Sequence, residues 1–251
     1  MASINISGTD WFFKHQPGTK YSGTLVFIHG SGGSHRLWDA QMDLGFDCIA
    51  LDLPGHGQSG GKPAASISDY AAGVSEFLGQ MRLNRPVYLV GHSMGAAISL
   101  TCALRQPELL DGIILIGAGP RMKVMPSFLD ALRSGDSDPG FFKLAFSPDA
   151  PTEMVDEMVQ AIALVPAAVL YADFSACNDF DLSQELEGIS LPALLIVGVD
   201  DKLTPQKLAL YISEHIARAR LEVIPGAGHF VMIEKPLEVN SLITDFCAKP
   251  L

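Results

Sequence analysis

The sequence predicts an α/β fold, with a mostly parallel, doubly wound sheet and an inserted helical lid. Three observations lead to this prediction. Short apolar runs of strand character alternate with helical patterns, several of these runs end in glycine-rich turns, and residues 120–190 contain no convincing strand. Alternation of this kind indicates parallel strands joined by crossover helices. A helix-only stretch as long as 120–190 exceeds what one crossover requires, and therefore predicts an insertion.

The strands are expected in short, nearly continuous apolar runs, which are typical of strands covered on both faces. An opening antiparallel hairpin is expected at residues 4–7 and 11–15, with Gly8-Thr9 in its turn. The parallel strands are then expected at residues 25–29, 48–53, 87–90, 112–116, 193–197 and 221–224. Ligands bind at the carboxyl ends of such strands, so the turns that follow them are the places to look for chemistry.

The interruption after the fourth parallel strand divides the chain into two parts. Residues 1–119 and 191–251 are predicted to form the core, and residues 120–190 the helical lid. Five prolines punctuate the insertion into short helices, and residues 151–164 carry apolar side chains at helical spacing; the prolines are Pro126, Pro139, Pro148, Pro151 and Pro166. The same stretch is also compatible with ordinary helical packing against the sheet.

The composition is that of a chain with a large buried core. Of its 251 residues 48% are hydrophobic and 18% charged, and the formal net charge is -11. This charge disfavours nucleic acid and anionic membrane surfaces as partners, because proteins that bind them concentrate Lys and Arg. We find no signal-peptide pattern and no apolar run of about 20 residues. We therefore expect no membrane span and a cytoplasmic location.

The four cysteines are far apart in the sequence, at Cys48, Cys102, Cys177 and Cys247. Their spacing matches neither a zinc site nor a compact disulfide framework, so we expect no metal. They are predicted to be small buried hydrophobic residues in a reducing compartment.

A nucleophile motif follows one predicted strand. Gly91-His92-Ser93-Met94-Gly95 lies between the strand at 87–90 and a helical stretch at 96–105. This is the G-x-S-x-G pattern in the strand–turn–helix setting that it requires. A sharp turn of this kind strains the serine backbone and needs small neighbours, and the helix that follows favours negative charge at its start. Ser93 is the predicted nucleophile.

A serine hydroxyl needs a base, and histidine accepts and returns a proton near neutral pH. His229 follows the last predicted strand, in the chain order nucleophile, acid, histidine. The loop after the preceding strand offers two acids, Asp200 and Asp201, and geometry decides which of them orients the imidazole. The other acid is then a turn residue that caps local backbone groups.

Two backbone N–H groups are expected to stabilise the oxyanion: that of Met94, and that of Ser31 in the glycine-rich turn after the first parallel strand. The other histidines fall into two groups. His15, His35 and His215 have polar neighbours in sequence and are expected to be solvated. His29, His56 and His92 are expected to shape the functional loops by hydrogen bonding.

Taken together, these motifs resemble the α/β-hydrolase superfamily, in its serine-nucleophile branch. The matching segments are His29-Gly30-Ser31-Gly32-Gly33, Asp52-Leu53-Pro54-Gly55-His56-Gly57-Gln58-Ser59, the Ser93 motif, Gly198 to Pro205, and Gly226 to His229. In these relatives the acid lies three residues after the glycine and four before the proline, which selects Asp201. The resemblance also implies the absence of a cofactor.

Within the superfamily, the resemblance favours a carboxylesterase acting through an acyl-enzyme. Epoxide hydrolases and haloalkane dehalogenases use an aspartate where Ser93 stands, and hydroxynitrile lyases carry a lysine where Phe230 stands. Gly33 and His92 depart from the pattern of carbon–carbon bond hydrolases of aromatic breakdown, which makes that activity less favoured. The same motifs also fit enol-lactonases, cofactor-free haloperoxidases or perhydrolases, and small-ligand receptors derived from hydrolases.

The expected substrate is a small-molecule ester with an apolar part, bound in a pocket beneath the lid. Its predicted lining is Trp38, Phe128, Phe142, Met158 and Phe230, with Leu129, Phe141 and Met154 as further candidates from the lid. Phe and Met at helical spacing are also typical of a simple core, and Trp38 is expected either to wall the pocket or to pack beneath it.

Overall fold

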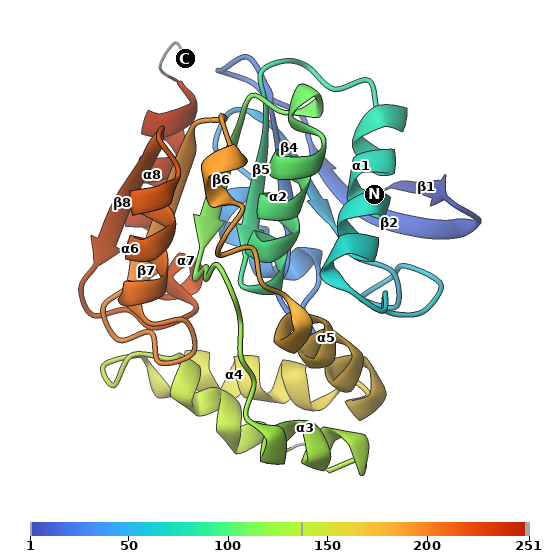
Figure 1. Ribbon diagram of the computed structural model, residues 1–251, viewed down its shortest axis with the longest axis vertical. Coiled ribbons are helices and arrows are strands. Elements are labelled where there is room, and N and C mark those ends of the chain that lie inside the picture. The colour runs from blue at the N-terminus through green and yellow to red at the C-terminus, as the bar shows by residue number, and fades with distance from the viewer. Residues whose placement is uncertain (1, 137, 249–251) are drawn as a thin grey trace.

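The computed structural model describes residues 2–136 and 138–248, and its centre is one eight-stranded sheet. The strand order is β1-β2-β4-β3-β5-β6-β7-β8 (Figure 1). The strands are β1 (Ala2–Ile6), β2 (Thr9–Gln16), β3 (Thr24–Ile28), β4 (Asp47–Leu51), β5 (Val87–His92), β6 (Gly112–Ile116), β7 (Ala193–Gly198) and β8 (Ala219–Ile224). β1 and β2 are antiparallel to their neighbours, and the pairs from β4 to β8 are parallel. The predicted sheet is confirmed.

The opening hairpin turns one residue earlier than predicted. Ile6 pairs with Thr9, so the two-residue loop is Ser7-Gly8 and not Gly8-Thr9. Ser7 has φ 45° and Gly8 φ 83°. Positive φ at both positions is what a two-residue hairpin turn of type I′ requires, and glycine meets this requirement readily.

Helices cover both faces of the sheet, because successive strand side chains point to opposite faces. On one face Val26 and Ile28 pack with α1 (Ile67–Gln80), α2 (Met94–Arg105) and α6 (Gln206–His215). On the other face Leu25 and Phe27 pack with η1 (His35–Gln41), α7 (Val231–Glu234) and α8 (Pro236–Cys247). The short helices η2 (Pro107–Leu109) and η4 (Leu186–Gly188) lie in connections. Burial on both faces explains the continuous apolar runs.

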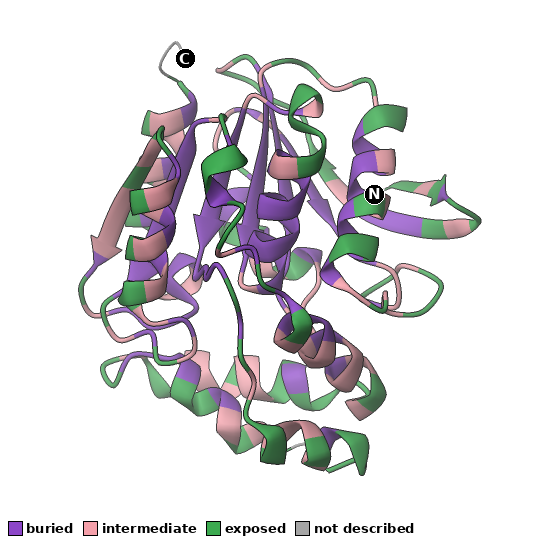
Figure 2. Cartoon of the chain, viewed as in Figure 1, coloured by how far each residue is buried: buried purple, intermediate pink, exposed green. Residues whose placement is uncertain are grey.

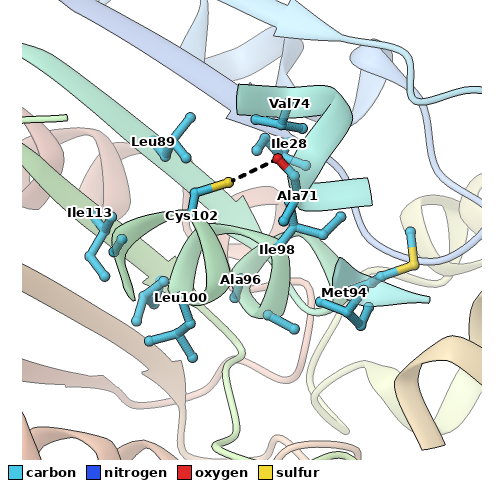
Figure 3. Close-up of a cluster of buried hydrophobic side chains, with 14 of the residues drawn as sticks. Ile28, Ala71, Val74, Leu89, Met94, Ala96, Ile98, Leu100, Cys102 and Ile113 are labelled. Carbon is cyan, nitrogen blue, oxygen red and sulfur yellow. Dashed lines mark hydrogen bonds between the residues drawn. The ribbon is translucent and has the colours of Figure 1, made fainter. Parts of the chain in front are cut away.

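The first of these core layers includes one of the cysteines. In Figure 3 Ile28 and Leu89 of the sheet face α1 and α2, and the Cys102 thiol donates to the Ala71 carbonyl at 3.6 Å. All four cysteines are buried and free, as predicted. Burial raises the pKa of Cys102 to about 12, so this thiol is not ionised at neutral pH.

The segment between β6 and β7 is helical, as predicted. It contains α3 (Pro126–Arg133), η3 (Pro139–Ala145), α4 (Thr152–Ala163) and α5 (Ala167–Asp179). Pro126 and Pro139 lie in the first turns of α3 and η3, and Pro151 and Pro166 are the N-caps of α4 and α5. Figure 1 shows these helices as a layer below the carboxyl ends of the strands, and Figure 2 shows that α3 and α4 are mostly exposed or half-buried.

The two ends of this helical segment lie side by side. The Leu182 N–H donates to the Pro120 carbonyl at 2.8 Å, and Arg121 forms an antiparallel bridge with Asp181. Within the described residues, no single helix is both long and apolar enough to cross a bilayer; α4 and α5 pass that test only as a pair bent by 99°.

Candidate active site

Ser93 lies in a sharp turn between β5 and α2. Its φ of 53° and ψ of -114° are an unusual conformation for a residue with a side chain, and such strain concentrates at functional sites. The residues two positions before and two positions after Ser93 must be glycines. A Cβ on Gly91 would collide with the Gly95 carbonyl, and a Cβ on Gly95 would collide with the Ile28 carbonyl. The G-x-S-x-G spacing is therefore a consequence of how closely β3, β5 and α2 approach one another.

Asp201 and His229 form a buried pair at the ends of β7 and β8. Their relative exposures are 4% and 3%, and His229 Nδ1 lies 2.9 Å from Asp201 Oδ2. The N–H groups of Leu203 and Thr204 donate to Asp201 Oδ1, at 2.9 and 2.8 Å. Burial alone would raise the pKa of Asp201, but the charge and hydrogen bond of His229, with the bonds from Thr204, lower it. An ionised carboxylate thus faces Nδ1 and favours a proton there.

The structure brings Asp201, and not Asp200, to His229. Asp200 is half-buried, and its Oδ2 accepts from the Ser147 hydroxyl at 3.1 Å.

Thr204 was not predicted as a site residue, but its hydroxyl contacts both members of the buried pair. It donates to Asp201 Oδ2 at 2.7 Å and also lies 3.0 Å from His229 Nδ1. The sequence Asp201-Lys202-Leu203-Thr204 indicates the backbone bonds to this carboxylate, since an Asp side chain in a turn accepts from N–H groups shortly after it; these bonds bring the Thr204 hydroxyl beside the same side chain.

Ser93 and His229 line the same cavity, whose volume is about 900 Å³. Among the hydrogen bonds of the described residues, none joins the Ser93 hydroxyl to His229. Catalytic hydrogen bonds are often long in an empty site and shorten when substrate binds. Gly30 lies close to Ser93, because a Cβ on Gly30 would be 3.2 Å from the Ser93 Cβ. The glycine-rich turn after β3 is therefore next to the candidate nucleophile.

Four of the five predicted pocket residues line this cavity: Phe128, Phe142, Met158 and Phe230, together with the further candidate Phe141. Trp38 does not. It is fully buried, and its ring lies 5.1 Å from that of Phe27 in the core. The expectation that Trp38 walls the pocket is therefore wrong, because η1 turns this side chain toward the sheet. Leu129 and Met154 are also outside the lining, and Met154 packs against the core.

The two residues expected to donate backbone N–H groups are in contact. The Ser31 hydroxyl lies 3.7 Å from the Met94 sulfur, and Met94 is the first residue of α2. The glycine-rich turn is closed by a 3.0 Å bond from the Gly33 N–H to the Gly30 carbonyl. Gly32 has φ 65°, as the third residue of a type II turn requires. The turn and the start of α2 thus lie on the same side of the site.

These features agree with a comparison with known proteins. A family model described as "Alpha/beta hydrolase family" matches residues 25–242. The chain belongs to this family. Protein ABHD8 of Homo sapiens is 28% identical over 241 residues, which are 88% of this chain and 54% of that protein. The chain thus spans about half the length of this curated relative.

Two esterases are also similar to this α/β hydrolase. The pimeloyl-[acyl-carrier protein] methyl ester esterase of Edwardsiella ictaluri (strain 93-146) is 28% identical, over 88% of this chain and 92% of that protein. A solved thermophilic esterase is 32% identical, with a TM-score of 0.85, and covers 98% of this chain and 96% of its own. These similarities confirm the predicted fold and superfamily, and they support a hydrolase of the esterase type.

A buried carboxylate that sequence reasoning missed joins the helical segment of this α/β hydrolase to the turn after β3. Asp173 of α5 has no exposed surface. It accepts from the Gly32 N–H at 2.8 Å, from His56 Nε2 at 2.8 Å and from the Tyr70 hydroxyl at 2.7 Å. Nothing local in the sequence around Asp173 indicates these partners. By accepting from the Gly32 N–H, Asp173 fixes the orientation of the Ser31–Gly32 peptide group, on which the type II turn depends.

His56 is a cation in this arrangement, because both of its ring nitrogens face acceptors. Nδ1 lies 3.0 Å from the Pro54 carbonyl and Nε2 lies 2.8 Å from Asp173. Burial alone would lower the pKa of His56, but the hydrogen bond and charge of Asp173 outweigh it, so the pKa is raised. The carbonyl of Pro54 and the charge of Asp52 act in the same direction.

The remaining histidines follow the predictions only in part. His15 is exposed as predicted, whereas His215 is half-buried and its ring stacks on Tyr211 at 4.0 Å. His29 Nδ1 bonds the Gly30 carbonyl, and His92 Nε2 bonds the His229 carbonyl, so both shape the site. Burial lowers the pKa of His29 and of His92, which are therefore neutral. His35 was expected to be solvated, and this is wrong. It is buried, and its Nδ1 lies 2.9 Å from Asp52 Oδ1, because β4 ends directly beside η1.

Replacing Asp173 by alanine is expected to destabilise the fold by about 3 kcal/mol or more, because it leaves a buried cation and two other donors without an acceptor. Chemical denaturation measures this loss. The wild-type pair stabilises the fold fully below the unfolded His pKa of about 6.5, and this stability is lost as pH rises through the raised pKa of His56. The variant should lack this pH dependence.

Asp179→Ala is the matched control, since Asp179 ends the same helix but is exposed. It should change stability by less than about 0.5 kcal/mol. Asp173→Asn, which removes the charge and replaces one of the two acceptor oxygens by a donor, should lie between the two. Equal stabilities for Asp173→Ala and Asp179→Ala would contradict the role given to Asp173.

Proposed function

We propose that this α/β hydrolase is a serine esterase that cleaves carboxylic esters through an acyl-enzyme. The observation that carries the proposal is the arrangement of three groups around one cavity. Ser93 occupies a strained turn, His229 of the buried Asp201–His229 pair lines the same cavity, and the glycine-rich turn at Ser31 lies next to Ser93. This arrangement provides a nucleophile, a base with an orienting carboxylate, and backbone donors.

In this mechanism Ser93 attacks the ester carbonyl while His229 takes its proton. Asp201 keeps the imidazole proton on Nδ1 and stabilises the imidazolium that forms. The backbone N–H groups of Ser31 and Met94 stabilise the oxyanion of the tetrahedral intermediate. His229 then protonates the leaving alcohol. A water molecule, activated by the same base, attacks the acyl-enzyme and releases the acid.

The helices between β6 and β7 act in this proposal as a lid on the core formed by residues 1–119 and 191–251. Phe128, Phe142 and Met158 come from this segment and face the same cavity as Ser93. An apolar wall of this kind binds the apolar part of an ester and excludes water, which strengthens the electrostatic interactions within the site.

A panel of nitrophenyl esters of increasing acyl length tests the proposal. The wild-type chain should turn them over repeatedly, and the acyl length with the highest kcat/KM should reflect the size of the cavity. A single turnover followed by a stable complex would instead support a ligand receptor. Failure to hydrolyse any ester of the panel would contradict the esterase proposal and favour a carbon–carbon bond hydrolase.

A further inference from the structure

The cavity lining carries charge of one sign only. Five cationic residues line it, and none of its lining residues within the described chain is an Asp or Glu; the five are Arg36, Arg121, Lys123, Lys202 and Lys207. Acidic residues outnumber Lys and Arg by 28 to 17 in the whole chain. The lining therefore has the opposite charge balance to the whole protein. Cations around a cavity with apolar walls produce a positive potential there, because the apolar walls screen their field less than water does.

These cations are not used to stabilise the fold through ion pairs. Among the described residues, none of the five takes part in an ion pair with a carboxylate, whereas six other cations do: Lys14, Arg85, Arg105, Arg133, Lys143 and Arg220. Lys123 donates to the Asn178 carbonyl at 2.8 Å. Asp181 is the acid near Arg121 and Lys123. Hydrogen bonds from Ser183 lower the pKa of Asp181, and these two cations lower it further.

Four of the five cations lie on two adjoining segments. Arg121 and Lys123 are in the loop after β6, whereas Lys202 is in the loop after β7, its neighbour in the sheet, and Lys207 is in the first turn of α6. The loop after β6 contacts this turn of α6, because a Cβ on Gly119 would lie 3.1 Å from the Leu208 side chain. The four cations therefore gather at one edge of the cavity, at the carboxyl ends of β6 and β7.

Lys207 occupies a position where a cation is unfavourable without an anion nearby. It is the second residue of α6, whose first turn contains no acidic residue. The amino end of a helix carries partial positive charge, so a lysine there is repelled and an anion is attracted. A local conflict of this kind is typical of functional positions.

We propose that the substrate carries, besides its ester and apolar part, an oxyanion group (a carboxylate or a phosphate) that binds at Arg121, Lys123, Lys202 and Lys207. This inference rests on the proposed esterase function and names its substrate class. Phe128, Phe142 and Met158 bind the apolar chain, and the four cations bind the anionic group at the cavity edge. The anionic group is remote from the reacting carbonyl, so its binding serves specificity and orientation.

Two esters of the same chain length, one ending in a carboxylate and the other in a methyl group, test the proposal. The 4-nitrophenyl monoester of glutaric acid carries a terminal carboxylate, and 4-nitrophenyl pentanoate is its neutral counterpart. The wild-type ratio of kcat/KM, anionic over neutral, should exceed one and should decrease with added salt, which screens exposed charges. The double variant Lys202→Gln/Lys207→Gln should lower this ratio about tenfold, as expected for the loss of two exposed charge contacts.

The double variant Lys62→Gln/Arg218→Gln is the matched control, because it removes two exposed cations from outside the lining. It should leave the ratio unchanged, and thermal unfolding should show that both double variants are folded. An equal decrease in the ratio for both variants would overturn the proposal, since the effect would then come from net charge. A wild-type ratio below one at low salt would also overturn it.

Calorimetric binding tests the anionic site without relying on turnover. Butyl phosphate and hexanoate should each bind the wild-type chain more tightly than hexanol, and the Lys202→Gln/Lys207→Gln variant should lose this preference. The stronger of the two anions identifies the type of oxyanion. Binding of hexanol as tight as that of both anions would overturn the site. Absence of ester hydrolysis with a preserved preference for anions would instead contradict the esterase function alone.

Discussion

The variant Ser93→Ala is expected to lower kcat for nitrophenyl esters by about 10⁴-fold or more, because the covalent step loses its nucleophile. Alanine keeps the Cβ and the turn conformation at φ 53°, so the fold should be retained. Steady-state kinetics with the preferred ester measures the loss, and circular dichroism checks that the variant is folded.

The control for this experiment is Ser213→Ala in α6, which removes a hydroxyl that bonds the Leu210 carbonyl and lies outside the cavity lining. It should leave kcat within about a factor of two, as surface substitutions usually do. If Ser93→Ala turned over the esters at the wild-type rate, Ser93 would not be the nucleophile and the proposed mechanism would fail.

The second large effect is expected at Asp201. The variant Asp201→Asn should lower kcat by about 10⁴-fold, the loss that such a change causes when the imidazole takes the wrong tautomer. The amide nitrogen of asparagine is a donor. In place of Oδ2 it would face both His229 Nδ1 and the Thr204 hydroxyl, and in place of Oδ1 it would face the N–H groups of Leu203 and Thr204. Steady-state kinetics at neutral pH measures this loss.

Asp200→Asn is the internal comparison, because the two residues are adjacent and carry the same charge. Asp200 accepts from Ser147 and does not contact His229, so its replacement should change kcat by about a factor of two at most. Equal or reversed losses for the two variants would contradict the assignment of Asp201. Ser147→Ala removes the hydroxyl that donates to Asp200 but keeps the Asp200 side chain, so it separates the effect of this hydrogen bond from that of the Asp200 charge.

The agreement between sequence and structure is best where the signal is local. The parallel strands, α2 and the Ser93 turn were predicted from patterns within about ten residues, because burial on both faces and close backbone approach restrict residue type at each position. Boundaries were less accurate. β5 extends to His92, two residues beyond the prediction, and the first hairpin turns at Ser7-Gly8.

The errors concern residues whose partners lie far away in the chain. Trp38 packs on the sheet and not in the cavity, and His35 is buried against Asp52, 17 residues away. Asp173 bonds Gly32, 141 residues away, and His56, 117 residues away. No pattern in sequence marks such contacts, because each depends on how elements far apart in the chain pack against one another: η1 on the sheet for Trp38 and His35, and α5 on the turn after β3 for Asp173.

The linear chain contains enough information to identify the sheet, the sharp turn at Ser93 and the family, since these depend on periodicity and on glycines at close approaches. Folding adds the contact between His229 and Asp201, which the family spacing had already selected over Asp200, together with the Asp173 contacts and the positive charge of the cavity edge. Each of these is a relation between side chains on different elements. Such relations arise when the loops after β3, β6, β7 and β8 meet at one end of the sheet, where burial strengthens the interactions between their charges.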